Sequence, residues 1–335
     1  MGEIFNQELI VADPNGREMG FVRENIKFDL DIGSTYDFEL RLDLNVWKKE
    51  KFWYGNIIYI PGTEYGGILE DLEVITKTNE IVFRGDAWRG MLRKKVIEPP
   101  SGKDHLVLNG ELNSLLRQLL GDYYEGLFVV DYIDSGIIVE NWKVDRYVLL
   151  YDAIMKLLEA YNQRLKISYV QGEGLEPGTV HIRAAPITDW SSELEYSQDD
   201  RLHFDIRDCR NGINHLVCAG KGQNDERLIL HLYVQEDGSI GDSKYYTGLS
   251  ERTALYEYTS ADADSLLEYG TKQLKELQNY KKINLSISNA DLELGDIVGG
   301  RERVTGVKLN KPIVRKILKI SKRRAIINYE IKGDD

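Results

Sequence analysis

Residues 291–301 read Asp-Leu-Glu-Leu-Gly-Asp-Ile-Val-Gly-Gly-Arg, and three short apolar runs follow with almost no spacers. The three runs begin at Thr305, Pro312 and Ala325. Gly, Asp and Pro, which end strands and form turns, separate these runs. The stretch therefore predicts a small barrel-like β-unit, and the pair at positions 299 and 300 is expected to form a tight turn between two strands.

The first ninety residues contain a second β-signal. Apolar and polar residues alternate through Ile26–Ile32 and again through Tyr36–Val46. A period of two over this length is typical of a hairpin with one packed face and one wet face. Further strands are expected at Asn56–Ile60, near Gly66–Thr76 and at Glu80–Arg84, so the region predicts a small antiparallel barrel or a curled sheet.

The middle of the chain mixes helical and strand periodicities. A short helix at 87–92, capped by Asp86, is expected to close the first β-region. Leucines at helical spacing predict a helix at Leu112–Leu120, and a longer apolar stripe predicts another at Tyr147–Leu165. The strands expected around these helices are 126–130, 137–140, 166–169 and 180–184.

From residue 201 the chain returns to strands, at 202–206, 214–219 and 227–234. A helix is expected from about Ala261 to Gln278, with Thr259 or Ser260 as its cap.

The pair Pro99-Pro100 marks a predicted domain boundary. The expected fold class is α+β and β-rich, with two small β-barrel-like domains flanking an α+β domain. The predicted limits are 1–98 for the first barrel-like domain, 99–203 for the α+β domain, and 204–335 for a second barrel-like domain with an inserted hairpin and helix.

The composition narrows the class of protein. The 335 residues are 42% hydrophobic and 29% charged, which suits two or three folded domains and excludes general disorder. The net charge of −12 argues against binding nucleic acid through the overall field. We find no charged-then-apolar leader and no window of about 20 apolar residues, so membrane insertion is not expected.

Metal binding and catalysis find little support in the sequence. The two cysteines, Cys209 and Cys218, lack the spacing of a four-ligand zinc site, so they are expected to be reduced thiols, and no metal or cofactor is predicted. Neither a nucleophile elbow, a Walker loop nor a dinucleotide motif occurs. The histidines are scattered, at His105, His181, His203, His215 and His231.

One acidic cluster invites a hydrolase interpretation. Asp199, Asp200, Asp205 and Asp208 crowd one segment beside His203. A glycoside hydrolase needs two carboxylates about 5–10 Å apart around a cleft, and closeness in sequence does not establish that geometry. We therefore predict no catalytic residue and no enzyme.

Two stretches resemble one known family. The final run, Leu-Gly-Asp-Ile-Val-Gly-Gly-Arg followed by Pro-Ile-Val-x-Lys-Ile and Ile-Asn-Tyr-Glu-Ile, is similar to the closing segment of siphophage tail proteins related to the phage baseplate hub. Residues 83–92, Phe-Arg-Gly-Asp-Ala-Trp-Arg-Gly-Met-Leu, lead to Pro99-Pro100 and resemble the end of the first tube-forming domain in that family. Lys95 stands where the family pattern has arginine. The resemblance covers about residues 66–100 and 280–332.

The resemblance implies a structural virion protein at the tail tip, assembled in the cytoplasm of a bacterial host. It implies a homotrimer whose two barrel-like tube domains per subunit form a ring through which DNA passes. Heterologous interfaces and strand edges suit such a ring. The implied partners are the distal tail or tail tube protein, the tape measure protein and a tail spike or fibre, without specific nucleic-acid binding.

Two sets of charged residues are the candidate functional positions. Acidic residues on the wet face of the first hairpin are expected to line the lumen and to repel DNA. A basic run near the C-terminus lacks the interleaved aromatics of a nucleic-acid patch and is expected to dock onto an acidic neighbour or subunit. The acidic set is Asp29, Asp31, Glu39 and Asp43, and the basic set is Lys311, Arg315, Lys316, Lys319 and Arg323.

Two alternative functions stay open. Related tail proteins can carry a peptidoglycan hydrolase, usually in a C-terminal extension, and no such domain is expected here because the chain ends directly after the β-unit. A carbohydrate- or receptor-binding tail module is the other alternative, with Trp47, Trp53 and Tyr54 as its aromatic surface. Packing of these rings in a core or an interface is the simpler interpretation.

Overall fold

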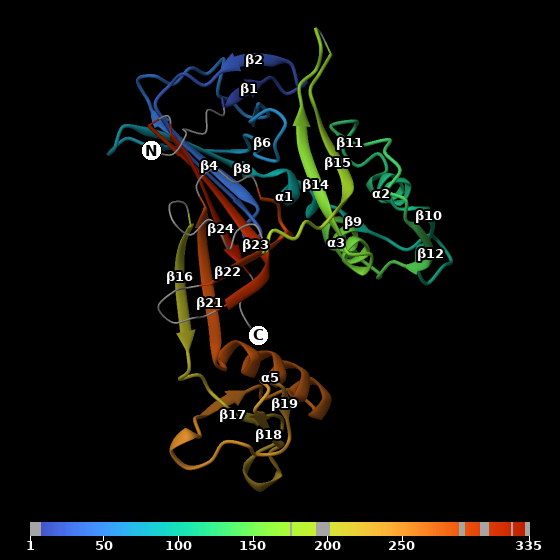
Figure 1. Ribbon diagram of the computed structural model, residues 1–335, viewed down its shortest axis with the longest axis vertical. Coiled ribbons are helices and arrows are strands. Elements are labelled where there is room, and N and C mark those ends of the chain that lie inside the picture. Colours follow the sequence, from blue (N-terminus) through green and yellow to red (C-terminus); the bar gives the residue numbers. More distant parts are fainter. Residues whose placement is uncertain are drawn as a thin grey trace. The chain divides into compact units, whose positions relative to one another are not determined.

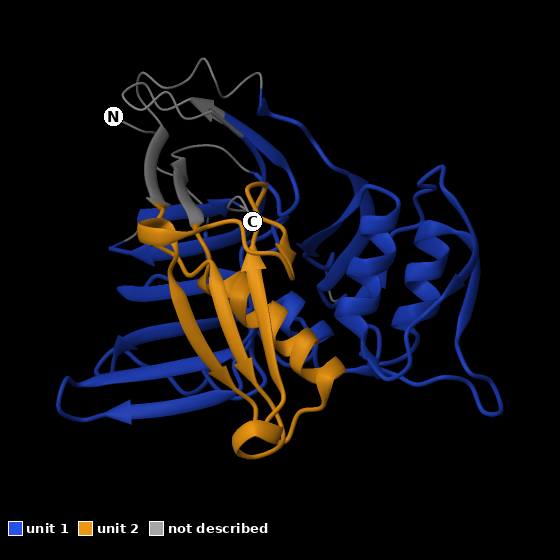
Figure 2. Ribbon diagram, turned by 90° about the horizontal axis from the view of Figure 1, so that it is seen from below, with its two compact units in different colours: residues 1–203, 285–331 blue, residues 204–284, 332–335 orange. Residues whose placement is uncertain are grey.

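The computed structural model describes residues 8–174, 176–191, 202–287, 292–301, 308–322 and 324–331. The chain divides into two compact units, which Figure 2 colours differently. Unit 1 consists of residues 1–203 and 285–331, and unit 2 of residues 204–284 and 332–335. The chain therefore leaves unit 1, forms unit 2 and then returns to unit 1.

The part of unit 1 before the first helix consists of short strands (Figure 1). These strands are β1 (Ile10–Ala12), β2 (Glu18–Phe21), β3 (Ile26–Ile32), β4 (Asp37–Asp43), β5 (Ile57–Tyr59), β6 (Gly66–Ile68), β7 (Asp71–Ile75) and β8 (Glu80–Asp86). The elements that follow are α1 (Trp88–Leu92), β9 (Val96–Ile97), β10 (Val107–Glu111), α2 (Leu112–Leu120), β11 (Phe128–Val130), β12 (Ile138–Lys143), β13 (Val148–Leu149), α3 (Leu150–Ala160), β14 (Gln163–Val170) and β15 (Thr179–Pro186).

Strands from both ends of the chain share the largest sheet of unit 1, which we call the main sheet. The returning strands are β22 (Ile297–Arg301), β23 (Lys308–Ser321) and β24 (Arg324–Ile331). Within unit 1 the strands of the main sheet run in the order β24-β23-β3-β4-β8-β7, each antiparallel to its neighbours, and β22 pairs with β23. The blue N-terminal strands and the red C-terminal strands therefore lie side by side in Figure 1.

The predicted hairpin is confirmed as β3 and β4. Phe28, Leu30 and Leu40 are fully buried on one face, while the residues between them are exposed or half-buried. This alternation gives the main sheet an apolar face that packs inside unit 1 and a polar face that carries the charged residues of the pattern.

One hydrophobic core joins the remaining layers of unit 1. The three-stranded sheet β11-β15-β14 has α2 and α3 packed on it, and a four-stranded sheet, β2-β1-β5-β6, contributes to the same core. Ile10, Trp88, Leu116, Ile154 and Ile182 are all buried members of this core. The core therefore continues across Pro99-Pro100.

Unit 2 is a small sheet with one helix on it. Its strand order is β19-β18-β17-β20, and β17 pairs with β18 antiparallel and with β20 parallel. Apolar side chains from α5 and from this sheet form a separate core, and Figure 2 shows the helix against one face of the orange strands. The elements are β17 (His215–Ala219), η1 (Asn224–Glu226), β18 (Ile229–Val234), β19 (Ile240–Gly241), η2 (Gly248–Ser250), β20 (Thr253–Glu257) and α5 (Ala263–Leu277), while β16 (Leu202–Cys209) and β21 (Tyr280–Ile287) carry the chain between the two units.

The turn predicted at the glycine pair is wrong, and the helix predicted at Tyr147–Leu165 is confirmed with shorter bounds, Leu150–Ala160. Gly299 and Gly300 lie inside β22 and form no turn. A Cβ on Gly299 would lie 2.6 Å from the carbonyl oxygen of Ser191, so this glycine permits a close backbone approach. Helix α3 ends at Ala160 because Asn162 adopts a φ of 52° and β14 begins at the next residue.

Both predicted caps are also wrong. Helix α1 is capped by Ala87 without a side-chain hydrogen bond, while Asp86 ends β8 and pairs with Lys94 at 3.1 Å. The cap of α5 is Asp262, whose carboxylate accepts a hydrogen bond from the Ser265 backbone N–H at 3.0 Å.

The predicted β-rich α+β class is confirmed. The described sheets are all open, so neither predicted β-unit is a closed barrel. The limits 1–98, 99–203 and 204–335 stay a prediction. Within the described ranges, every helix is too short or too polar to cross a lipid bilayer.

Candidate functional site

The polar face of the main sheet brings the two predicted sets of charges together. Asp29 on β3 lies opposite Glu39 on β4 and opposite Lys319 on β23. Directly opposed residues in antiparallel strands project from the same face. Asp31 and Arg315 meet on that face as well, so residues predicted for a lumen and for an interface are neighbours here.

Ion pairs neutralise part of the acidic set. The Arg315 Nε donates to Asp31 at 2.6 Å, and its Nη1 donates to Glu330 at 2.9 Å. The Arg84 Nε and the Arg41 Nε both donate to Glu39, at 2.9 and 2.5 Å. Partial burial alone would raise the pKa of Glu39, but these hydrogen bonds and charges lower it overall. The face therefore carries alternating charges and is not a uniformly acidic wall.

The other two acidic residues are exposed. Asp43 accepts hydrogen bonds from the side-chain amide of Asn79 at 2.9 Å and from the backbone N–H of Asn45 at 2.8 Å. Asp29 lies between Glu39 and Lys319. These two carboxylates are the members of the acidic set that solvent reaches most freely.

The basic set does not form one surface. Lys319 is exposed, and Lys311 and Arg315 are half-buried. Arg323 lies outside the described residues. Lys316 is only 1% exposed on the apolar side of β23, so its side chain does not lie on the surface, which argues against its predicted place in a subunit interface.

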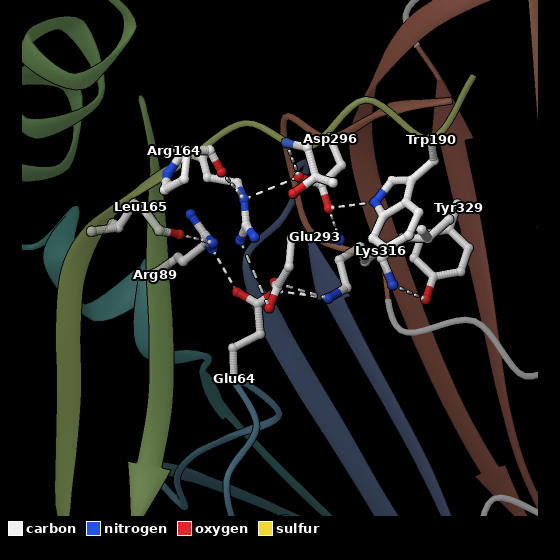
Figure 3. A network of polar contacts seen from close by, with 12 residues as sticks. Glu64, Arg89, Arg164, Leu165, Trp190, Glu293, Asp296, Lys316 and Tyr329 are labelled. Atoms are coloured by element: carbon white, nitrogen blue, oxygen red, sulfur yellow. Dashed lines mark hydrogen bonds and ion pairs between the residues drawn. The ribbon is translucent and has the colours of Figure 1, made fainter. Parts of the chain in front are cut away.

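Lys316 belongs to a buried charge network, which we define as Glu64, Arg89, Arg164, Glu293, Asp296 and Lys316 (Figure 3). The Lys316 Nζ lies 3.0 Å from one oxygen of Glu64 and 3.4 Å from Glu293. The second oxygen of Glu64 accepts from the Arg89 Nε at 2.8 Å, and the Arg89 Nη2 donates to the Leu165 carbonyl at 2.8 Å. The side chains of Glu64, Arg89 and Lys316 are each at most 2% exposed.

Asp296 organises the other half of the network. Its carboxylate pairs with the Arg164 Nε at 3.0 Å and accepts from the Trp190 Nε1 at 3.3 Å. It also accepts from the backbone N–H groups of Thr188 and Glu293, at 3.1 and 3.2 Å. One side chain therefore fixes the turn before β22 and the segment after β15.

Burial and charge shift the pKa values of this network in opposite directions. Burial raises the pKa of Glu64, but Arg89 and Lys316 outweigh it and hold the value at about 2. Burial lowers the pKa of Lys316, but the neighbouring carboxylates raise it well above its ordinary value. Burial and the charge of Glu64 raise the pKa of Glu293. Three cations thus face three carboxylates in a low-dielectric interior, where each charge depends on its partners.

The network links both sequence stretches that carry the family resemblance. Arg89 comes from the stretch before Pro99-Pro100, while Glu293, Asp296 and Lys316 come from the closing stretch. Because the network is buried, it is better placed to hold β23 against the rest of unit 1 than to contact a ligand. Sequence reasoning missed the network, although the spacing of Lys316 with two buried residues, Leu318 and Ile320, places it on the apolar side of β23.

The histidines and cysteines form no metal site in the part of the chain that the structure describes, where no three His, Cys, Asp or Glu side chains are grouped to hold an ion. His215 bridges Glu251 and His231, with both contacts at 2.9 Å. Cys209 and Cys218 are free thiols, and burial raises the pKa of Cys218 to about 11, which disfavours a reactive thiolate.

The acidic cluster beside His203 was the sequence feature that invited a hydrolase interpretation. Asp199 and Asp200 lie outside the described residues, as do the side chains of His203, Asp205 and Asp208.

The three aromatic residues proposed for a glycan surface pack on one another. The ring centroids of Trp47 and Trp53 are 6.1 Å apart, and those of Trp53 and Tyr54 are 5.0 Å apart. The Lys49 Nζ lies 4.3 Å from the centroid of the Trp53 ring, and the Trp47 Nε1 donates to the Phe52 carbonyl. Tyr54 is 46% exposed. These contacts favour the interpretation as a packed loop.

Comparisons with known proteins give matches in structure alone. No model of a protein family matches the sequence, and no curated protein matches it. A chain in the structure of the phage P2 baseplate in its activated conformation with Ca is 12% identical, with a TM-score of 0.50, and the match covers 97% of this chain and 98% of that chain. A topological model of the P2 virion baseplate gives 13% identity and a TM-score of 0.50, covering 98% of this chain and 100% of that chain. The tail protein from Neisseria meningitidis MC58 gives 13% identity and a TM-score of 0.48, covering 99% and 97%.

Proposed function

Because the chain has the fold of phage tail and baseplate proteins, we propose that it is a structural component of a phage tail. The observation that carries this proposal is the extent of the match, which covers 97% or more of both chains in each P2 baseplate comparison. A match of this extent includes residues of both units. We assign no catalytic role to the chain.

The finer proposal concerns position and assembly. Three copies form a ring at the tail tip that joins the tail tube or distal tail protein to a spike or fibre. The tape measure protein is a further partner, and assembly takes place in the host cytoplasm. The main sheet supports this proposal because ion pairs cross-link neighbouring strands on its polar face. The buried charge network holds β23 on the apolar side of the same sheet.

The molar mass of the purified chain tests the ring. Light scattering across a concentration series should give three times the 38.5 kDa of one chain, and negative-stain images of that species should show a central hole. A monomer at every concentration would contradict a ring formed by this chain alone. A filament without closure would contradict the trimer.

The exposed carboxylates predict that the ring repels DNA electrostatically. We propose that Asp29 and Asp43 face the lumen and repel phosphates, while the other two acidic residues are balanced by arginines. The double variant Asp29→Lys with Asp43→Lys should keep the molar mass of the wild type and acquire salt-sensitive binding to double-stranded DNA. Fluorescence anisotropy with a labelled duplex measures this, and unchanged, negligible binding would contradict the lumen assignment.

A further inference from the structure

The polar face of the main sheet ends in opposite charges. At one end, β7 and the residue before it carry exposed carboxylates on Glu70, Asp71 and Glu73. At the other end, the hairpin of β23 and β24 carries three exposed cations: Lys319 near the end of β23, Lys322 in the turn, and Arg324 at the start of β24. Three strands separate β23 from β7 in the sheet, so the two ends are roughly 19 Å apart.

The acidic end has more negative charge than its neighbours can balance. Asp71 lies opposite Arg84, and both Asp71 and Glu73 pair with that arginine, at 3.3 and 2.8 Å. The same arginine also pairs with Glu39, which Arg41 contacts as well, so its charge is shared among three carboxylates. Among the described strands, β7 pairs with β8 alone, and half of its backbone groups are therefore left facing outward.

The basic end is a hairpin whose three cations form no ion pair with another described residue. Ser321 lies opposite Arg324, and the exposed Lys322 occupies the turn with a φ of 51°. Lys319, Lys322 and Arg324 take part in none of the ion pairs found among the described residues. Ile326 lies opposite Lys319 on the same hairpin and is 59% exposed.

We propose that the acidic end of one copy binds the basic turn of a second copy. Each end supplies the charge that the other lacks, because three carboxylates lie along an open strand edge and three cations lie at the end of a hairpin. Because the two ends are different surfaces of one sheet, this contact is heterologous, and repeating it closes a ring if the rotation allows. The inference rests on the proposed ring and identifies its contact surfaces.

Charge reversal at each end tests the contact. The basic-end variant carries Lys319→Glu, Lys322→Glu and Arg324→Glu, and the acidic-end variant carries Glu70→Lys, Asp71→Lys and Glu73→Lys. Each variant alone places like charges opposite one another and should raise the dissociation constant of self-association about 100-fold or more in sedimentation experiments. Circular dichroism establishes that each variant is folded. A matched control, Lys48→Glu with Lys103→Glu and Lys272→Glu, makes the same charge change at other exposed lysines and should associate like the wild type.

Two combinations of these substitutions test whether the two ends bind one another. Mixing the two variants restores opposite charges at every contact, so association should return, in species with even numbers of copies. A chain that carries all six substitutions should again associate with itself as the wild type does. Loss of association in each variant without recovery in the mixture would overturn the pairing of these two ends.

Different experimental outcomes would contradict the contact between the two ends and the ring itself. A wild-type trimer that tolerates reversal at the basic end overturns the contact and leaves the ring standing. A wild-type chain that stays monomeric at every concentration contradicts both the ring and the contact. Raising the salt concentration from 50 to 500 mM should weaken the wild-type assembly, since the contact is between exposed charges.

Discussion

Replacing Glu64 with glutamine should lower the free energy of unfolding of unit 1 by about 3–5 kcal/mol, because it leaves two buried cations without their shared counter-charge. The Lys316 ammonium lies 3.0 Å from Glu64 and the Arg89 guanidinium lies 2.8 Å from it, and both side chains are at most 2% exposed. Glutamine keeps the shape of the side chain, so the change tests the charge rather than the packing.

Urea unfolding followed by circular dichroism measures this effect, and Asp145→Asn is the control. Asp145 also forms an ion pair, with Lys156 at 2.6 Å, but its side chain is 54% exposed and lies outside the proposed contact between copies. Exposed ion pairs contribute at most about 1 kcal/mol, so the control should stay within that range. Equal effects of the two substitutions would show that burial adds nothing to the importance of the network.

The pH dependence of the same comparison has a definite sign. The pKa of Glu64 falls from an ordinary value of 4.5 to about 2 in the folded chain. A carboxylate with a lowered pKa contributes stability above pH 4.5 and loses that contribution as the pH falls toward 2. The difference in unfolding free energy between the wild type and Glu64→Gln should therefore shrink across this window. A difference that stays constant from pH 5 to pH 2.5 would contradict the lowered pKa.

The sequence predicted individual strands and helices better than it predicted which strands pair with one another. The alternation through Ile26–Ile32 defines a strand because its own side chains decide which face is buried, and the leucines of Leu112–Leu120 define a helix in the same way. Pairing of β3 with β23 joins opposite ends of the chain, and no periodicity records which distant strand supplies the next hydrogen bonds.

In the candidate site, too, the sequence predicted local patterns but not contacts between residues that are far apart in the chain. The wet-face carboxylates were found because they alternate with apolar residues, but the arginine that pairs with Asp31 comes from β23, far along the chain. Lys316 looked like part of a basic surface because it stands among other cations in sequence. Its neighbour Arg315 points to the polar face and Lys316 to the apolar side, since successive residues of a strand alternate.

The stretch that resembles the family also contains a steric requirement. Gly85 lies at the end of β8, where β6 passes close to it, and a Cβ there would lie 1.9 Å from the carbonyl oxygen of Ile68. On the other strand, a Cβ on Gly67 would lie 2.2 Å from the carbonyl oxygen of Asp86. The two glycines thus allow the backbones of β6 and β8 to approach more closely than side chains permit.

Gly85→Ala should therefore lower the free energy of unfolding by about 3 kcal/mol, the upper part of the range for overpacking, since the added methyl meets backbone that has no rotamer to change. The control is Gly102→Ala, where no atom lies within 4 Å of the new Cβ and the cost comes from a φ of 75° alone, about 1 kcal/mol. Urea unfolding of both variants separates lack of space from backbone strain. A Gly85→Ala variant as stable as the wild type would show that β6 moves away from β8 at little cost, so that the glycine in this stretch does not hold the two sheets together.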